Sequence, residues 1–386
     1  MIKCIDEIKI EGKRVFMRLD FNVPLEFSGD TVRITDDTRI REAVPTIKHA
    51  LDRGVRLILA SHLGRPEPQA DGSRDPKASL APVAERLQEL LGVDLMLSDD
   101  IVGDGVEMAV KHLKTSQVIL LENLRYHPGE EQNDPQFCRD LARLADVYIS
   151  DAFGTTHRKH ASTYGVAQLM QPRGCGFLIK KELTFLNRLL QDPTPPFVAI
   201  LGGSKVSDKI KTIESLLPLV DTLLIGGLMG NTFLVARGET LPAGSKQPKP
   251  EEVAYAKNLI EKAKKSEVPL LLPQDSNAGF DIGHQTIQAF RSVIREARTI
   301  FWNGPLGMFE NPEYAQGTFA IAHEIAAVRG LKIVGGGDSV AAVHAAGVAD
   351  KMDHISTGGG ACLEFLEGKG LPGIEVLQDY SKVVRD

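Results

Sequence analysis

The chain repeats one pattern along most of its length: a short apolar run rich in β-branched residues, a turn, and then a stretch with the helical spacing of apolar residues. The apolar runs are Val15–Leu19, Val55–Ala60, Val118–Leu121, Val147–Ser150, Phe197–Leu201, Thr222–Ile225, Pro269–Leu272, Thr299–Trp302 and Leu331–Val334. Such near-continuous apolar strands, alternating with helices, are typical of parallel sheets that are covered on both faces. The sequence therefore predicts an α/β fold with doubly wound parallel sheets.

The length of the chain indicates more than one domain, because 386 residues exceed what one compact core usually holds. Between the two halves, apolar residues recur at helical spacing at Ile179, Leu183, Leu186 and Leu190. The sequence QDPTPP then ends that helix. We interpret residues 174–196 as a hinge helix and linker between two Rossmann-like domains, residues 1–173 and residues 197–370. An ordinary surface helix is the alternative.

The overall composition argues against several classes of protein. A net charge of −6 gives no reason to expect binding to nucleic acid or to a membrane surface. The cysteines lie far apart without CxxC spacing, which argues against a zinc site or a disulfide framework: Cys4, Cys138, Cys175 and Cys362. No apolar run is long enough to span a membrane, and the N-terminal MIKCIDEIKI does not read as a secretory signal. We therefore expect a cytoplasmic protein in a reducing compartment.

In the first half of the chain, polar and basic residues follow the predicted strands, where open parallel sheets bind ligands. These residues are Asp20, Phe21, Asn22, Arg39, His62, Gly64, Arg65, Arg125, Asp151, His157, Arg158 and His160. Guanidinium groups bind phosphate and carboxylate through two parallel hydrogen bonds, so the four arginines together predict an anion site. The alternative is a set of solvated arginines with no shared ligand, and each histidine alone is as often a structural hydrogen-bonding group.

In the second half, glycine and lysine follow the strands instead. The segments are GGSKVSDK with Lys205 and Lys209, GGLMGN, NGPLGMFE ending at Glu310, GGGDS with Asp338, and STGGGAC with Gly358 to Gly360. Glycine between a strand and a helix lets backbone N–H groups approach phosphates. Lys205 and Lys209 would share one face of a helix. Asp338 at a helix start suits a Mg²⁺ contact beside phosphates, and Glu310 suits a ribose; the alternative is that these are only tight turns.

Several common nucleotide-binding motifs are missing from the sequence. There is no GxxxxGK[ST] of a P-loop protein and no GxGxxG in the first strand–helix unit of a dehydrogenase. The HRD and DFG motifs of protein kinases are also missing. These absences argue against three large classes of nucleotide-binding enzyme.

Taken in order, the motifs resemble those of the phosphoglycerate kinase family. The matching segments are KRVFMRLDFNVP, SHLGRP, LLENLRYHPGEE, DAFGTTHRKHAS, GGSKVSDKI, NGPLGMFE, GGGDS and STGGGACLEFLEG. The resemblance implies reversible phosphoryl transfer between ATP and the carboxylate of 3-phosphoglycerate, with Mg²⁺, giving ADP and 1,3-bisphosphoglycerate. It also implies a monomer whose C-terminal tail, residues 371–386, packs back on the N-terminal domain.

Site residues follow from the resemblance, motif by motif. The residues implied to bind phosphoglycerate are Asp20, Phe21, Asn22, Arg39, His62, Leu63, Gly64, Arg65, Arg125 and Arg158. Those implied to bind the nucleotide are Lys205, Lys209, Glu310, Gly336, Gly337, Asp338 and Ser339, with Asp338 also on the metal. Leu228 in GGLMGN departs from the glycine of many members, near the adenine side. We assign no role to the polar loop of residues 65–77, and we expect Ser79 to cap the helix that follows it.

The chemistry of the acceptor explains why no catalytic base stands out. A carboxylate is already ionised at neutral pH and needs no proton removed. Catalysis is then positioning and charge stabilisation, for which Arg39, Lys205 and Lys209 are the candidates. Because the arginines and the lysines lie in different halves, we expect hinge bending to bring the substrates together. The alternatives are another small-molecule carboxylate kinase or a non-catalytic protein that binds a phosphometabolite.

Overall fold

The chain divides into two compact units, which are described separately here. In the computed structural model, residues 2–29, 31–67, 73–241 and 245–378 are described. The first unit comprises Met1–Glu182 together with Gly370–Asp386, and the second unit comprises Leu183–Lys369. The division falls inside helix α7, Phe177–Gln191, within the segment that the sequence marks as the junction.

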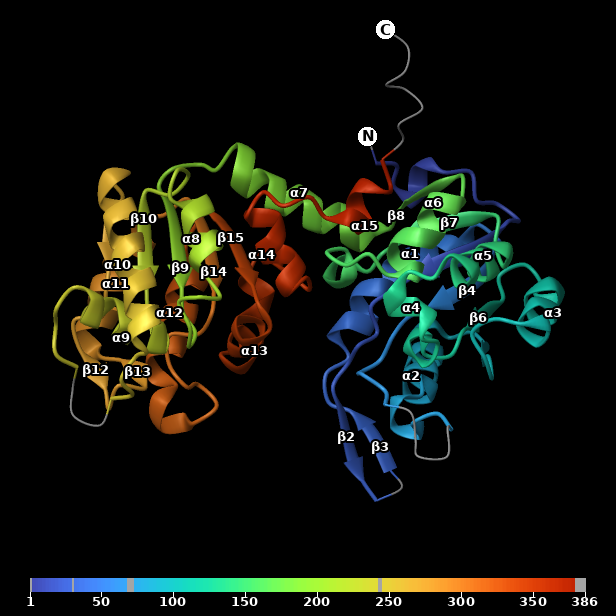
Figure 1. Cartoon of the computed structure of the whole chain (residues 1–386), viewed down its shortest axis with the longest axis horizontal. Helices are drawn as coiled ribbons and strands as arrows, with labels where there is room; N and C mark the ends of the chain where they lie inside the picture. Colours follow the sequence, from blue (N-terminus) through green and yellow to red (C-terminus); the bar gives the residue numbers. More distant parts are fainter. Residues whose placement is uncertain (1, 30, 68–72, 242–244, 379–386) are drawn as a thin grey trace, which may run out of the picture. The chain divides into compact units, whose positions relative to one another are not determined.

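The first unit contains a parallel six-stranded sheet with the order β5-β6-β4-β1-β7-β8. Its strands are β1 Arg14–Arg18, β4 Arg56–Ala60, β5 Leu95–Leu97, β6 Val118–Leu120, β7 Val147–Ser150 and β8 Arg173–Cys175. Its helices are α1 Thr38–Asp52, α2 Ala81–Leu91, α3 Asp104–His112, α4 Gly129–Gln132, α5 Pro135–Arg143, α6 Val166–Leu169 and α15 Pro372–Glu375. A hairpin of β2 Leu25–Ser28 and β3 Thr31–Ile34 projects from this unit (Figure 1). β1 lies between β4 and β7, so the segments after these strands meet at one edge of the sheet.

The second unit also contains a parallel six-stranded sheet, connected in a different order, β11-β10-β9-β14-β15-β16. Its strands are β9 Phe197–Leu201, β10 Thr222–Ile225, β11 Leu270–Leu271, β14 Thr299–Asn303, β15 Leu331–Gly335 and β16 His354–Ile355. Its helices are α8 Ile210–Leu216, α9 Gly227–Ala236, α10 Pro250–Lys265, α11 His284–Glu296, α12 Gln316–Ala327, α13 Gly337–Ala345 and α14 Gly360–Leu366. A short hairpin joins β12 Ser276–Asn277 to β13 Asp281–Ile282.

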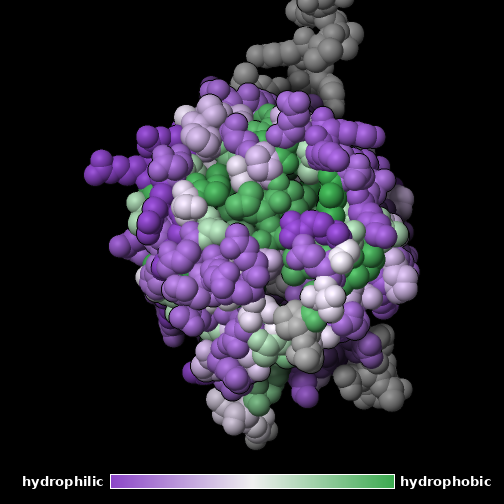
Figure 2. Space-filling view, turned by 90° about the vertical axis from the view of Figure 1, so that its left-hand side faces the viewer, coloured by the Kyte–Doolittle hydropathy of each residue, from purple (hydrophilic) through white to green (hydrophobic). Residues whose placement is uncertain are grey.

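One core of the second unit shows how the apolar strand pattern becomes buried surface. Phe290 of α11 and Ile325 of α12 are fully buried against Trp302 of β14 and Val334 of β15. Figure 2 faces the side of this unit that carries α10 and α11, and it shows an apolar area surrounded by polar side chains.

β11 is the edge strand of the sheet, and its Leu270 and Leu271 are partly exposed. A two-residue edge strand offers little backbone for pairing with another chain.

The predicted fold class, two doubly wound parallel sheets, is confirmed. Each apolar run listed from the sequence overlaps a strand, whereas β5, β8 and β16 of the two large sheets and the strands of both hairpins were not predicted. α2 begins at Ala81, so Leu80 rather than Ser79 occupies the N-cap position, but the Ser79 side chain still satisfies a backbone donor of the first turn. Ser79 ends a preceding 3₁₀ turn; its Oγ accepts from the Ala81 N–H at 3.2 Å and donates to Glu122.

α7 is fixed to the first unit by a buried carboxyl group at the end of β7. Asp151 accepts hydrogen bonds from the Ile179 N–H at 3.0 Å and from Thr46 Oγ1 at 2.5 Å. Thr46 Oγ1 in turn accepts from the Phe177 N–H at 3.0 Å. Burial raises the pKa of Asp151 to about 7. These contacts satisfy backbone donors in the first turn, which explains why the helix starts here.

The last described residues lie on the first unit. The Gly373 N–H in α15 donates to the Thr156 carbonyl at 2.8 Å, and Gln378 forms an antiparallel bridge with Ile2. The predicted tail extends to residue 386, and residues 379–386 lie outside the described part of the chain. Among the helices of the described residues, none combines the length and apolar character needed to cross a membrane.

Candidate active site

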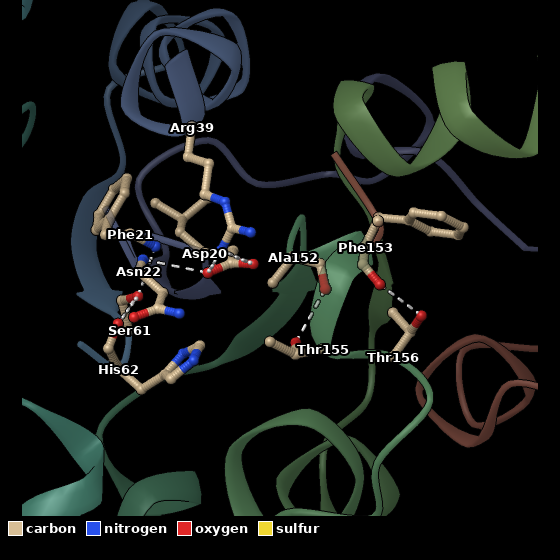
Figure 3. A network of polar contacts seen from close by, with 12 residues as sticks. Asp20, Phe21, Asn22, Arg39, Ser61, His62, Ala152, Phe153, Thr155 and Thr156 are labelled. Carbon is tan, nitrogen blue, oxygen red and sulfur yellow. Dashed lines mark hydrogen bonds and ion pairs between the residues drawn. The ribbon is translucent and has the colours of Figure 1, made fainter. Parts of the chain in front are cut away.

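The loops that follow β1 and β4 are joined by hydrogen bonds at the carboxyl edge of the first sheet (Figure 3). The Phe21 N–H donates to Ser61 Oγ at 2.8 Å, and the Gly64 N–H donates to Asn22 Oδ1 at 2.8 Å. The Asn22 N–H donates to Asp20 Oδ1 at 3.2 Å. The structure therefore brings the predicted DFN and SHLGRP motifs into one hydrogen-bonded loop cluster.

Arg39 approaches this cluster from the first turn of α1. Its Nη1 lies 3.1 Å from both carboxylate oxygens of Asp20 (Figure 3). Burial alone would raise the pKa of Asp20, but nearby positive charge, above all that of Arg39, holds this pKa below its usual value. The Arg39 side chain is 36% exposed and that of Asp20 only 9%, so the guanidinium faces solvent from an anchored position.

Three of the four predicted arginines line one pocket of about 530 Å³ in the first unit. Arg65, Arg125 and Arg158 share it with His160 and Glu131. Arg125 is held by the Gly64 carbonyl at 2.5 Å and by Glu131 at 3.0 Å. Burial lowers the pKa of Arg125, and the charges of Arg158 and Arg65 lower it further. Repulsion of this kind is relieved when an anion binds, so the pocket suits a phosphate.

His62 lies between the Asp20 cluster and the arginine pocket and is uncharged. Burial lowers the pKa of His62 to about 3. The negative charge of Asp20 acts to raise this pKa, whereas the positive charges of Arg18, Arg125 and Arg39 lower it further. Arg18 Nη2 lies 3.2 Å from His62 Nδ1. Because a guanidinium only donates, Nδ1 is the acceptor and the ring proton lies on Nε2. Burial likewise lowers the pKa of His160 in the pocket to about 4.

Acid should therefore destabilise the first unit through His62. The native pKa of about 3 lies below the value of about 6.5 for an unfolded histidine. The contribution of neutral His62 to the free energy of unfolding is therefore fully present above pH 6.5 and is lost as the pH falls toward 3. The loss amounts to about 2 kcal/mol at pH 5. We expect His62→Asn, which keeps an acceptor toward Arg18, to flatten the fall of the thermal midpoint between pH 7 and pH 5. The exposed His112→Asn serves as control, and equal pH profiles for both variants would contradict the prediction.

A buried network behind the pocket was missed by the sequence reasoning. Arg18 is only 1% exposed; its Nε donates to Ser162 Oγ at 2.7 Å and its Nη1 donates to the Leu19 carbonyl. Ser162 donates to Glu130 through Oγ at 2.6 Å and through its N–H at 3.0 Å. The available signal was a charged residue inside a strand predicted to be buried on both faces. This network fixes the floor beneath the predicted anion site.

In the second unit, Lys209 joins the ends of two neighbouring strands. Its Nζ donates to Asn303 Oδ1 at the end of β14, and Asn303 Nδ2 donates to the Gly335 carbonyl at the end of β15, 2.7 Å away. Burial lowers the pKa of Lys209, while acidic neighbours including Asp338 act in the opposite direction. Lys209 is therefore a partly desolvated cation beside the GGGDS segment.

The predicted shared helical face of Lys205 and Lys209 is wrong. α8 begins only at Ile210, Lys209 is its N-cap, and Lys205 is exposed in the preceding loop. The chain between the two lysines instead forms a turn, in which the Lys209 N–H donates to the Val206 carbonyl at 2.9 Å. A Cβ on Gly202 would lie 2.1 Å from the Pro305 carbonyl oxygen, so this glycine is required by a close approach of two backbone segments.

The start of α13 is exposed, unlike the partly buried Lys209. Asp338 lies exposed in its first turn, and a Cβ on Gly337 would meet nothing within 4 Å. Exposed backbone donors at the start of a nine-residue helix suit a phosphate group. Ser339 is buried and its Oγ already accepts the Gly304 N–H at 2.5 Å, so it holds the turn together. Glu310 is exposed in the loop after β14.

A magnesium ion would have one protein carboxylate here. The described residues contain no group of three or more His, Cys, Asp or Glu side chains placed to hold a metal. Mg²⁺ bound with nucleotide phosphates commonly uses one or two carboxylates and keeps several waters. Asp338, exposed next to Gly337, fits that requirement.

Loss of the Lys209 charge should weaken nucleotide binding selectively. Lys209→Ala removes the partly buried cation beside α13 but changes nothing in the first unit. We expect a loss of ADP affinity of about tenfold or more, as for a charge-assisted hydrogen bond of about 1.5–3 kcal/mol. Calorimetry with ADP and separately with 3-phosphoglycerate measures this, with the exposed Lys211→Ala as control. Unchanged ADP affinity would refute the assignment.

Comparisons with known proteins cover almost the whole chain. A family model described as phosphoglycerate kinase matches residues 5–280 and 275–369. The chain is 47% identical over 401 residues to phosphoglycerate kinase of Anaeromyxobacter sp. (strain K), covering 98% of this chain and 100% of that protein. It is 50% identical over 398 residues to that of Moorella thermoacetica, covering 97% and 98% of the two chains.

Solved structures agree with these sequence matches. The phosphoglycerate kinase from Coxiella burnetii matches with a TM-score of 0.84 and 38% identity, covering 98% of this chain and 99% of that one. The phosphoglycerate kinase from Pyrococcus horikoshii OT3 matches with a TM-score of 0.80 and 30% identity, covering 98% of each chain. The chain belongs to the phosphoglycerate kinase family.

Proposed function

We propose that the chain catalyses reversible phosphoryl transfer between ATP and the carboxylate of 3-phosphoglycerate. The observation that carries the proposal is the pocket in which Arg65, Arg125 and Arg158 converge without enough acidic residues to neutralise them. The second unit complements it with a lysine and an open helix start, which suit a nucleotide. On this proposal, the first unit binds phosphoglycerate and the second unit binds ATP or ADP.

Each part of phosphoglycerate has a chemical match in the first unit. The three pocket arginines suit its phosphate, which carries the greatest charge. The Asp20 carboxylate, with a lowered pKa, suits the substrate hydroxyl as a hydrogen-bond acceptor. Arg39 suits the reacting carboxylate, and Asn22 and His62 fix the loops between these groups.

In the second unit, the proposal assigns Lys209 and the Gly336–Ser339 turn to the nucleotide phosphates, with exposed Lys205 at the transferred group and Glu310 at the ribose. A Mg²⁺ ion held by Asp338 would neutralise negative charge on the nucleotide phosphates while the terminal phosphoryl group is transferred. The attacking carboxylate needs no base, which agrees with the uncharged His62 and His160. We further propose that the protein is cytoplasmic and that it is a monomer; sedimentation equilibrium would test the oligomeric state.

Direct attack by the substrate predicts inversion at phosphorus. No covalent enzyme intermediate is required, because a carboxylate and a phosphoryl donor react in one in-line step. Transfer from ATP with a chirally labelled γ-phosphoryl group measures the outcome. Retention of configuration would instead require two successive displacements.

A coupled assay with ATP, Mg²⁺ and 3-phosphoglycerate tests the proposed activity. Turnover that depends on all three components is the expected result. Folded protein that binds both ligands without turnover would favour a phosphometabolite-binding protein. Turnover only with a different carboxylic acid would favour another carboxylate kinase.

A further inference from the structure

We infer that Cys4 and Cys175 form a reversible redox pair that closes to a disulfide in the first unit. The two residues are directly paired in an isolated parallel bridge beside β8. Neighbouring strands lie about 4.8 Å apart, and paired residues point to the same face of a sheet. That spacing falls within the range of about 4.4–6.8 Å between the Cα atoms of a disulfide. Neither cysteine takes part in the proposed substrate or nucleotide sites.

The segment around Cys4 packs closely against the end of β8. The Cys175 N–H donates to the Lys3 carbonyl at 2.9 Å. A Cβ on Gly174 would lie 2.4 Å from the same carbonyl oxygen and 2.6 Å from Ile8 Cδ1, so the two segments are in direct contact. Cys4 and Cys175 are 2% and 3% exposed, respectively. The pair is therefore held together in the reduced protein.

The two thiols are in different protonation environments. A hydrogen bond from Cys175 lowers the pKa of Cys4, whereas the same interaction raises the pKa of Cys175. Negative charge on Cys4 raises the pKa of the nearby Lys180, which also forms an ion pair with Asp6 at 3.3 Å. Thiolate, stabilised in this way, is the form that reacts with oxidants. Cys4 is thus the attacking thiol and Cys175 the resolving thiol.

The reaction balances with a peroxide as the two-electron oxidant. The Cys4 thiolate attacks one peroxide oxygen, the O–O bond breaks, and a proton from solvent completes the leaving water while Cys4 becomes a sulfenic acid. Cys175 sulfur then attacks the Cys4 sulfur, the S–O bond breaks, and hydroxide takes the Cys175 proton to leave as a second water. A dithiol reductant returns both thiols and is itself oxidised to a disulfide.

Access for the oxidant requires local opening rather than global unfolding. The Cys4 bridge is a single pair outside the six-stranded ladder, close to the described N-terminal residue. A single bridge of this kind opens more readily than the paired core of a sheet. Cys175 also lies two positions before α7, so closure would attach the N-terminal segment beside the start of that helix.

Peptide mapping of the full-length protein tests the inference directly. The protein is treated with hydrogen peroxide, remaining thiols are alkylated, and the digest is analysed with and without dithiothreitol. We expect a Cys4–Cys175 cross-linked peptide that disappears on reduction, and a thermal midpoint roughly 5–10 °C higher in the oxidised form. Cys4→Ser and Cys175→Ser should each abolish both effects.

Cys138 provides a matched control, because it is buried and burial raises its pKa to about 11. Cys138→Ser should keep the cross-link and the rise in thermal midpoint. No cross-linked peptide in oxidised wild-type protein would overturn the inference, as would a midpoint rise that persists in Cys4→Ser. The wild-type peptide map decides the question by itself if a serine variant does not fold.

Discussion

Replacing Arg39 with alanine should lower kcat by about 10²–10³, with a smaller effect on KM. In the described residues, the Arg39 guanidinium hydrogen-bonds through Nη1 to Asp20, and its other nitrogens bond to no protein group. The group is thus anchored by one nitrogen and has donors available for a ligand. A contact that strengthens as charge develops on the transferred group stabilises the transition state more than the bound substrate.

Steady-state kinetics with both substrates varied would separate the two effects. Arg41→Ala is the matched control, since Arg41 lies on the same helix, is exposed, and pairs with Asp37 at 2.8 Å. A thermal midpoint for each variant checks that loss of the Asp20 partner has not unfolded the first unit. A change confined to KM would make Arg39 a group that binds substrate and transition state equally.

Replacing Glu130 with alanine should destabilise the first unit by about 3–5 kcal/mol. Glu130 is 1% exposed, and both of its oxygens accept hydrogen bonds from Ser162. Burial raises the pKa of Glu130, while the charge of Arg18 and the hydrogen bonds from Ser162 act in the opposite direction. Ser162 Oγ also accepts from Arg18, so serine links the buried guanidinium to the buried carboxylate. Removing the carboxylate leaves the positive charge of Arg18 in a poorly solvated place.

Denaturant unfolding of Glu130→Ala, Glu130→Gln and Glu131→Ala measures this effect. Glu131 is the neighbouring residue on α4, but its side chain is 57% exposed, so its loss should cost about 1 kcal/mol or less. Glu130→Gln keeps an acceptor and should fall between the other two variants. Similar losses for Glu130→Ala and Glu131→Ala would mean that Arg18 finds sufficient compensation elsewhere.

The long apolar strands could be predicted from sequence because each carries enough β-branched residues to be recognised alone. β8, with the sequence RGC, and the two-residue β16 have no such pattern and form only because a neighbouring strand supplies the ladder. The arginine pocket could be anticipated, since parallel strands end at a common edge. The Arg18–Ser162 contact joins residues 144 positions apart, and no local pattern encodes it. The helical pairing of Lys205 and Lys209 failed because the chain between them forms a separate turn and α8 begins only at Ile210.

The first unit is assembled from two separate stretches of the chain, with the second unit inserted between them. During synthesis, residues 183–369 leave the ribosome before the segment that holds α15 and the Ile2–Gln378 bridge. The second unit therefore has all its strands available while the first still lacks its closing segment. Contacts such as that between Gly373 and Thr156 can form only after the second unit has been translated in full. Nascent chains should thus complete the first unit only after the second unit has been translated.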